Sequence, residues 1–122
     1  MDRWFLTLGS LSAFLAVGAG AFGAHAFKTR IAPDLLDVYE TAARYHFFQA
    51  LGLIVVAFAA ARWPGLPVQL AGWLFLAGTL LFSGSLYLLS LTGLRWLGAI
   101  TPFGGLAFLA GWLCLAWAGW RG

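Results

Sequence analysis

The segment Trp4–His25, which reads WFLTLGSLSAFLAVGAGAFGAH, is a long apolar run that carries no Asp, Glu, Lys or Arg. As an α-helix with a rise of about 1.5 Å per residue, the part from Trp4 to Ala24 would cover roughly 31 Å. That length matches the hydrocarbon core of a bilayer, which is about 30 Å thick. We therefore expect a membrane-spanning helix over about residues 4–27.

A secretory signal peptide is the alternative interpretation of this segment. Arg3 provides a basic start, and Ala24-His25-Ala26 fits the small-x-small pattern of a cleavage site. The apolar run is longer than the roughly 7 to 15 residues of a signal-peptide core. We therefore expect a first span that is retained in the protein.

Small residues recur along the first span at spacings of three and four, which places them on one side of a helix. Such a side lets a neighbouring backbone approach closely, and this is how helices associate in lipid. Glycines in the second half of the chain predict a similar surface. The expected helix-packing residues are Gly9, Ser12, Ala16, Gly20, Gly23, Gly84, Gly104, Gly105 and Gly111.

The composition identifies a membrane protein, since 62% of the 122 residues are hydrophobic, only 9% are charged, and the mean hydropathy is +0.90. The seven Lys and Arg residues are scattered singly, whereas nucleic-acid binding requires a basic patch. Cys114 is the one cysteine, so the chain offers neither an internal disulfide nor a cysteine metal site. We expect no cofactor, no nucleic acid, and the lipid bilayer as the surroundings.

Three further spans follow, over about residues 45–62, 68–91 and 96–120. Before them, Pro33 and the aspartates that follow it are typical of a helix start. The segment 33–44 predicts a short amphipathic helix on the membrane surface. The link Thr92–Arg95 is short enough to make its two spans antiparallel neighbours. The expected fold is an all-α, polytopic membrane protein: one domain, 1–122, with four spans in an antiparallel bundle.

Polar residues gather at the end of the bundle where the first and third spans end and the second and fourth begin. In lipid, such side chains bond across helices or line a site. The candidate polar cluster comprises His25, Tyr45, His46, Gln49, Tyr87, Ser90, Arg95 and Thr101. His46 and Gln49 are three residues apart, and we expect the pair to share a helix face within reach of His25. Two histidines alone are weak evidence for haem or a metal, and no serine has an adjacent base, so we assign no catalytic or metal-binding residue.

Four short segments, taken in order, resemble a known family: Gly20–His25 (GAFGAH), Tyr39–Tyr45 (YETAARY), Leu81–Tyr87 (LFSGSLY) and Thr101–Gly105 (TPFGG). The chain is similar over nearly its whole length to the domain-of-unknown-function family 423, small bacterial inner-membrane proteins. The resemblance implies a four-span protein of the inner (plasma) membrane. It implies no activity, because the family has no assigned substrate or catalytic residue.

One departure from the family pattern concerns the polar pair. Where the family typically has Tyr-Gln-x-x-His-Ala-Leu, Tyr45–Leu51 reads YHFFQAL, so the glutamine and the histidine have exchanged places. The exchange would move a ligand by about 4.5 Å along a helix axis, which counts against a metal centre.

Our leading functional hypothesis is a non-enzymatic membrane protein that associates with its own copies or serves as an accessory subunit of a membrane complex. The alternative is a small transporter or ligand-binding protein that uses the candidate polar cluster. Three basic residues at one membrane face against four at the other leave the orientation open.

Overall fold

The computed structural model describes residues 3–27 and 29–122, which are helical apart from short links. The helices are α1 (Arg3–His25), α2 (Pro33–Arg62), α3 (Leu66–Gly78), α4 (Gly84–Thr92) and α5 (Thr101–Arg121). The described residues contain four segments long and apolar enough to cross a membrane: Arg3–His25, Pro33–Arg62, Leu66–Thr92 and Arg95–Arg121. This confirms the expectation of an all-helical chain with four candidate spans.

Helix α2 differs from the sequence prediction, because no separate amphipathic helix over 33–44 exists. Residues 33–44 are the first turns of a single helix of 30 residues that continues to Arg62. Pro33 lies in the first turn, where its missing N–H costs nothing, and neither proline nor glycine interrupts the helix near Arg44. Tyr39, Ala42 and Ala43 are buried in this part of α2, so packing holds it in line with the rest.

The third span contains a π-helical turn, η1 (Thr79–Ser83), between α3 and α4. A π turn inserts one extra residue, and such turns are frequent at functional sites. Gly93 ends α4 with φ of +74°, a left-handed conformation that glycine adopts without strain. A short 3₁₀ helix, η2 (Arg95–Ala99), then leads into α5.

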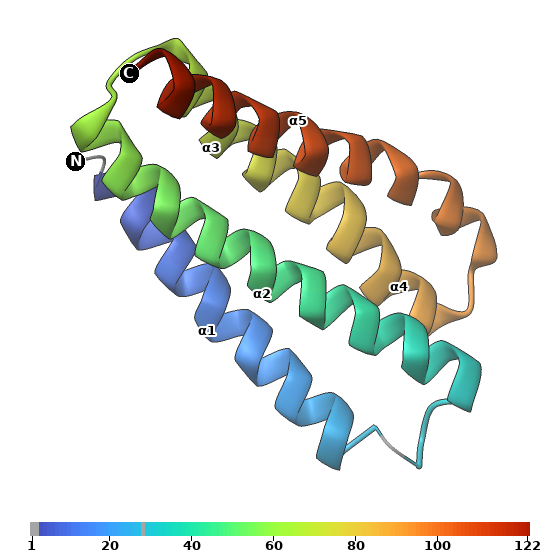
Figure 1. Ribbon diagram of the computed structural model, residues 1–122. Coiled ribbons are helices and arrows are strands. Elements are labelled where there is room, and N and C mark those ends of the chain that lie inside the picture. The colour runs from blue at the N-terminus through green and yellow to red at the C-terminus, as the bar shows by residue number, and fades with distance from the viewer. Residues whose placement is uncertain (1–2, 28) are drawn as a thin grey trace.

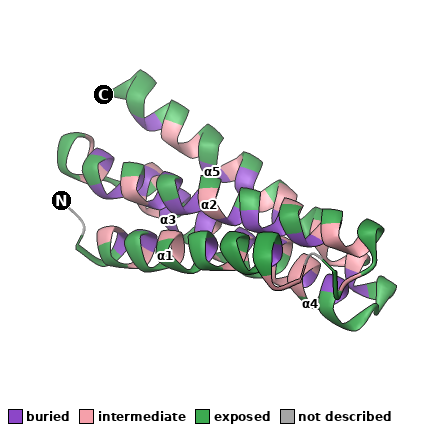
Figure 2. Cartoon of the chain, turned by 90° about the horizontal axis from the view of Figure 1, so that it is seen from below, coloured by how far each residue is buried: buried purple, intermediate pink, exposed green. Residues whose placement is uncertain are grey.

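The spans lie side by side in the order α1, α2, α3 with α4, and α5, and the chain reverses direction at each link (Figure 1). Both ends of the described chain lie at the same end of the molecule (Figure 1). Buried positions concentrate on α2, whereas α1 and α5 are largely exposed (Figure 2). Helices α2 and α3 with α4 therefore form the centre, with α1 and α5 on either side.

Aromatic rings packed onto glycines bring the helices together. A Cβ added at Gly72 would overlap the Phe5 ring, and one at Gly78 would lie 2.5 Å from Phe108 Cδ1. Phe5, Phe75 and Phe108 belong to the buried hydrophobic core. Each ring thus occupies the space that a larger side chain on the facing helix would need, which gives the close contact that packing in lipid relies on.

The predicted helix-packing residues fall into two groups. Gly9, Gly23, Gly104 and Gly111 are buried, and an added Cβ would clash with α2, with Tyr39, with the Phe82 backbone and with Phe75, respectively. Ala16 is also buried, and Ser12 bonds to His46. By contrast, a Cβ at Gly20 would have nothing within 4 Å, and those at Gly84 and Gly105 would make ordinary contacts at 4.0 and 3.8 Å.

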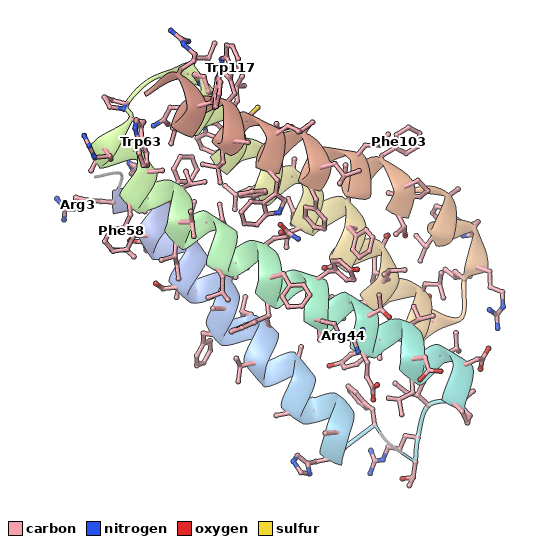
Figure 3. The ribbon with its side chains drawn as sticks, viewed as in Figure 1. Arg3, Arg44, Phe58, Trp63, Phe103 and Trp117 are labelled. Atoms are coloured by element: carbon pink, nitrogen blue, oxygen red, sulfur yellow. The ribbon has the colours of Figure 1, made fainter. Side chains whose placement is uncertain are left out.

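The end of the molecule that holds both chain ends also carries aromatic and basic residues. Trp63, Trp117 and Arg3 lie there (Figure 3). The Arg62 guanidinium lies 5.6 Å from the Trp63 ring centroid, and that of Arg121 lies 5.9 Å from the Trp117 ring. Tryptophan and arginine are typical of a membrane–water interface.

Candidate functional site

Helix α2 carries the buried polar side chains that could form a site. His46 and Gln49 lie near its middle and expose only 9% and 4% of their surface. A polar residue in the middle of a membrane helix is costly unless it is paired, and such a residue is often functional. The partners of these two side chains therefore decide what each can do.

The His46 cluster consists of His46, Ser12 and Tyr87. His46 Nδ1 lies 3.0 Å from the Tyr87 hydroxyl, and Nε2 lies 2.9 Å from Ser12 Oγ. A neutral imidazole has one donor and one acceptor nitrogen, and both hydroxyls can serve either role. The histidine is thus fully paired, and it links α1, α2 and α4.

Hydroxyl groups around this cluster bond mostly to backbone carbonyls. Ser83, in the π turn, donates to the Ala42 carbonyl of α2 at 2.9 Å, and Ser90 donates to the Tyr87 carbonyl at 2.8 Å. Ser85 lies 2.6 Å from the Thr101 hydroxyl and so links α4 to α5. Among the described residues, no fully buried side-chain nitrogen or oxygen lacks a hydrogen bond.

Tyr39 is a buried contributor that the candidate polar cluster did not include. Its hydroxyl donates to the Ala19 carbonyl of α1 at 2.6 Å, and its ring stands edge-on to the Tyr87 ring at 5.3 Å. The ring also fills the space beside Gly23. Tyr39 therefore joins the His46 cluster to the α1–α2 packing.

Gln49 has a different environment from His46. Its Oε1 accepts a hydrogen bond of 3.0 Å from Trp112 Nε1 on α5, while His46 bonds to α1 and α4. Residues three apart differ by about 60° around a helix. Because α2 lies between its neighbours, this angle is enough to direct the two side chains to different helices.

A groove runs between α2 and α5, and we call it the α2–α5 groove. Its volume is about 1170 Å³, larger than the roughly 300 to 1,000 Å³ of typical ligand pockets. Its lining is mostly apolar and rich in aromatic rings, and the amide of Gln49 lies against it. The residues that line it are Thr41, Tyr45, Phe48, Gln49, Leu51, Phe82, Pro102, Gly105, Leu106, Phe108, Leu109 and Trp112.

The remaining members of the candidate polar cluster lie apart. His25 is exposed at the end of α1, and Tyr45 packs against Phe82 at the side of the α2–α5 groove. Arg95 forms an exposed ion pair with Asp34, with 3.1 Å between Nη2 and Oδ2. Such surface pairs contribute little to stability. The predicted cluster is therefore divided between the His46 cluster, the groove and the membrane face.

The described residues contain no group of three or more His, Cys, Asp or Glu side chains placed to hold a metal ion. Sequence reasoning gave no role to Trp112, because nothing in its spacing distinguishes it from the other tryptophans of the fourth span. The signal that could have found it is the need of buried Gln49 for a donor from a neighbouring helix.

The sequence of this chain is similar to known membrane proteins. Residues 19–105 match a family model described as a protein of unknown function (DUF423). The chain is 52% identical to the UPF0382 membrane protein YwdK of Bacillus subtilis over 91% of each chain. It is 46% identical to the UPF0382 membrane protein SH2409 of Staphylococcus haemolyticus, over 93% of this chain and 92% of that one. No solved structure matches. The predicted resemblance is confirmed: the chain belongs to this family of small membrane proteins of unknown function.

Proposed function

We propose that this chain is a non-enzymatic protein of the inner (plasma) membrane, an antiparallel bundle of four spans that works by associating with its own copies. The polar groups support the non-enzymatic part. Ser83 and Ser90 bond to backbone carbonyls, and the ring nitrogens of His46 bond to hydroxyls. These side chains act as contacts between and within helices, which is the common role of polar residues in membrane bundles.

The observation that carries the association is an unused small-residue face on α1. Ala13, Gly20 and Ala24 lie on this face together with the larger Val17, and Val17, Gly20 and Ala24 are exposed. An added Cβ at Gly20 would have nothing within 4 Å, whereas α2 fills the space at Gly9 and Gly23. Unlike Gly18, Gly20 has further small residues on its own face of the helix, and such a face lets the backbone of a second copy approach closely in lipid.

Disulfide crosslinking in native membranes tests the association. The background is Cys114→Ala, which removes the natural thiol. In that background, oxidation of Gly20→Cys should give a dimer of twice the chain mass. Gly18→Cys is the matched control, because Gly18 also has open space but lies about 160° away around the helix.

Equal dimer yields at the two positions would show that the Gly20 face is not the specific contact. No dimer at either position would reject association through α1. A product of another mass from Gly20→Cys alone would replace self-association by an accessory role in a membrane complex.

A second candidate function, binding of a ligand, is favoured by the environment of Gln49. That glutamine is buried, it lies against the α2–α5 groove, and its hydrogen bond with Trp112 uses the carbonyl end of the amide.

A further inference from the structure

The α2–α5 groove is open because its two helices hardly touch each other. In the part of the chain that the structure describes, α5 packs mainly on α3, and α2 packs on α1, α3 and α4, which leaves a space between α2 and α5. None of the described residues that line it is charged. A ligand in this site is therefore uncharged where it contacts the protein, since a buried unpaired charge would be costly.

The Gln49 amide has a defined orientation. Trp112 Nε1 is a donor only, so the atom that receives it at 3.0 Å is the amide oxygen. The amide nitrogen, with two donor hydrogens, is the other end of the same group. Among the described residues, Trp112 is the hydrogen-bond partner of this side chain, and Gln49 borders the groove while only 4% exposed. The amide nitrogen is therefore available as a donor to a molecule in the groove.

Aromatic rings surround this donor. The Phe82 ring lies 5.1 Å from the Tyr45 ring and 5.3 Å from the Phe108 ring, and all three line the groove. Tyr45 precedes Gln49 by four residues, so its side chain lies on the same side of α2. Flat aromatic walls suit a flat ring, which can stack on them or meet them edge to face.

The depth of Gln49 in the bilayer limits which molecules can bring an acceptor to it. Helix α5 has 21 residues and is therefore about 31 Å long, which matches the hydrocarbon core. Trp112 lies near the middle of α5, so the Gln49–Trp112 pair lies roughly one half-thickness, about 15 Å, from each polar region. The ester carbonyls of phospholipids stay in those polar regions. The acceptor must instead belong to an apolar molecule that enters the bilayer interior.

We propose that the α2–α5 groove binds a prenyl quinone, with the Gln49 amide donating to a ring carbonyl and the aromatic walls enclosing the ring. The prenyl chain follows the apolar part of the groove. A volume of about 1170 Å³ accommodates the ring and the first part of such a chain. The site binds the molecule; no electron transfer is part of the proposal.

Native mass spectrometry of the protein released from nanodiscs tests the proposal, because the mass of the adduct identifies the ligand. The probe is a 1,4-benzoquinone that carries a decyl chain, and the matched probe is decylbenzene, which has the same chain and no carbonyl. We expect a one-to-one adduct with the quinone, and at least fivefold less adduct with decylbenzene at the same concentration. Equal binding of the two probes, or phospholipid adducts only, would overturn the proposal.

Two variants locate the site. Gln49→Leu removes the donor, and the loss of one hydrogen bond should weaken quinone binding about fivefold to tenfold. Gly105→Leu keeps Gln49 and Trp112 but extends a side chain into the groove, since a Cβ there makes only an ordinary contact of 3.8 Å with Phe82. It should prevent binding of both probes, even if Gln49→Leu folds poorly.

Thr79→Val is the control variant. The Thr79 hydroxyl bonds to the Phe75 carbonyl of its own helix and does not line the groove, so this variant should bind the quinone as the natural chain does. Quinone binding that persists in Gly105→Leu would place the ligand elsewhere and refute the proposal. Association through α1 would be unaffected by any of these results.

Discussion

His46 shows how a costly residue can stabilise a membrane bundle. An imidazole inside the hydrocarbon region must be paired, and its two ring nitrogens reach Ser12 on α1 and Tyr87 on α4. The histidine therefore connects two helices that flank α2. This pairing accounts for its position near the middle of the helix.

The pairing of His46 with Ser12 predicts a measurable coupling. In a double-mutant cycle of His46→Leu and Ser12→Ala, the coupling should be about 0.6 kcal/mol and at most about 1.7 kcal/mol, as for other hydrogen bonds between membrane helices. Unfolding in mixed micelles of mild detergent and sodium dodecyl sulfate measures each free energy. Thr92→Val is the control partner, because the Thr92 hydroxyl donates to the Leu88 carbonyl and accepts from the Leu94 N–H, and neither group belongs to the His46 cluster. Additive effects of His46→Leu and Ser12→Ala would show that their contact contributes nothing.

Residue patterns predicted where the polar side chains lie along the helices better than they predicted their partners. A spacing of three places His46 and Gln49 near each other on α2, and this was visible in the sequence. The two side chains differ in direction by about 60° around α2. Whether they contact the same neighbouring helix or two different ones depends on how the other helices are arranged around α2. That arrangement is set by contacts such as Phe5 on Gly72 and Phe82 on Gly104, which join residues far apart in the chain.

Helix α2 is longer than the span that the sequence analysis predicted. Its 30 residues are about 45 Å long, roughly 15 Å more than a hydrocarbon core. The charges on its first turns indicated a surface segment, but charge does not break a helix when Pro33 lies at its start. The π turn η1 was equally hidden, because no residue type in Thr79–Ser83 demands an extra residue in the turn.

A proline at Arg44 distinguishes one continuous helix from two. Arg44 is exposed and lies inside α2, so Arg44→Pro removes a helical hydrogen bond and should lower the free energy of unfolding by about 3 kcal/mol or more. Arg44→Ala is the matched control: it removes the same charge, keeps the helix, and should change stability little. Unfolding curves in detergent give both values. A small effect of the proline would mean that the helix is already interrupted there.

At the scale of the whole molecule, the lipid permits an arrangement that water would not. Helices α1 and α5 expose large side chains such as Phe14, Leu113 and Trp117, and Phe103 points away from the other helices (Figure 3). In lipid these surfaces carry no penalty, because hydrocarbon tails are as apolar as the side chains. The bundle can therefore stay open along the α2–α5 groove, while the helices pack closely at glycines such as Gly9, Gly72 and Gly104.

The path of the chain predicts which segments share a membrane face. The reversal at each link puts the Trp63–Gly65 link and Gly122 on one face, and Thr29 and Leu94 on the other (Figure 1). Single cysteines at Pro64, Gly122, Thr29 and Leu94 in the Cys114→Ala background test this, because none of these substitutions changes a charge that sets orientation. A maleimide that cannot cross membranes should label Pro64→Cys and Gly122→Cys from one side only, and Thr29→Cys and Leu94→Cys from the opposite side. Labelling of Pro64→Cys and Leu94→Cys from the same side would mean that the third span does not cross the bilayer.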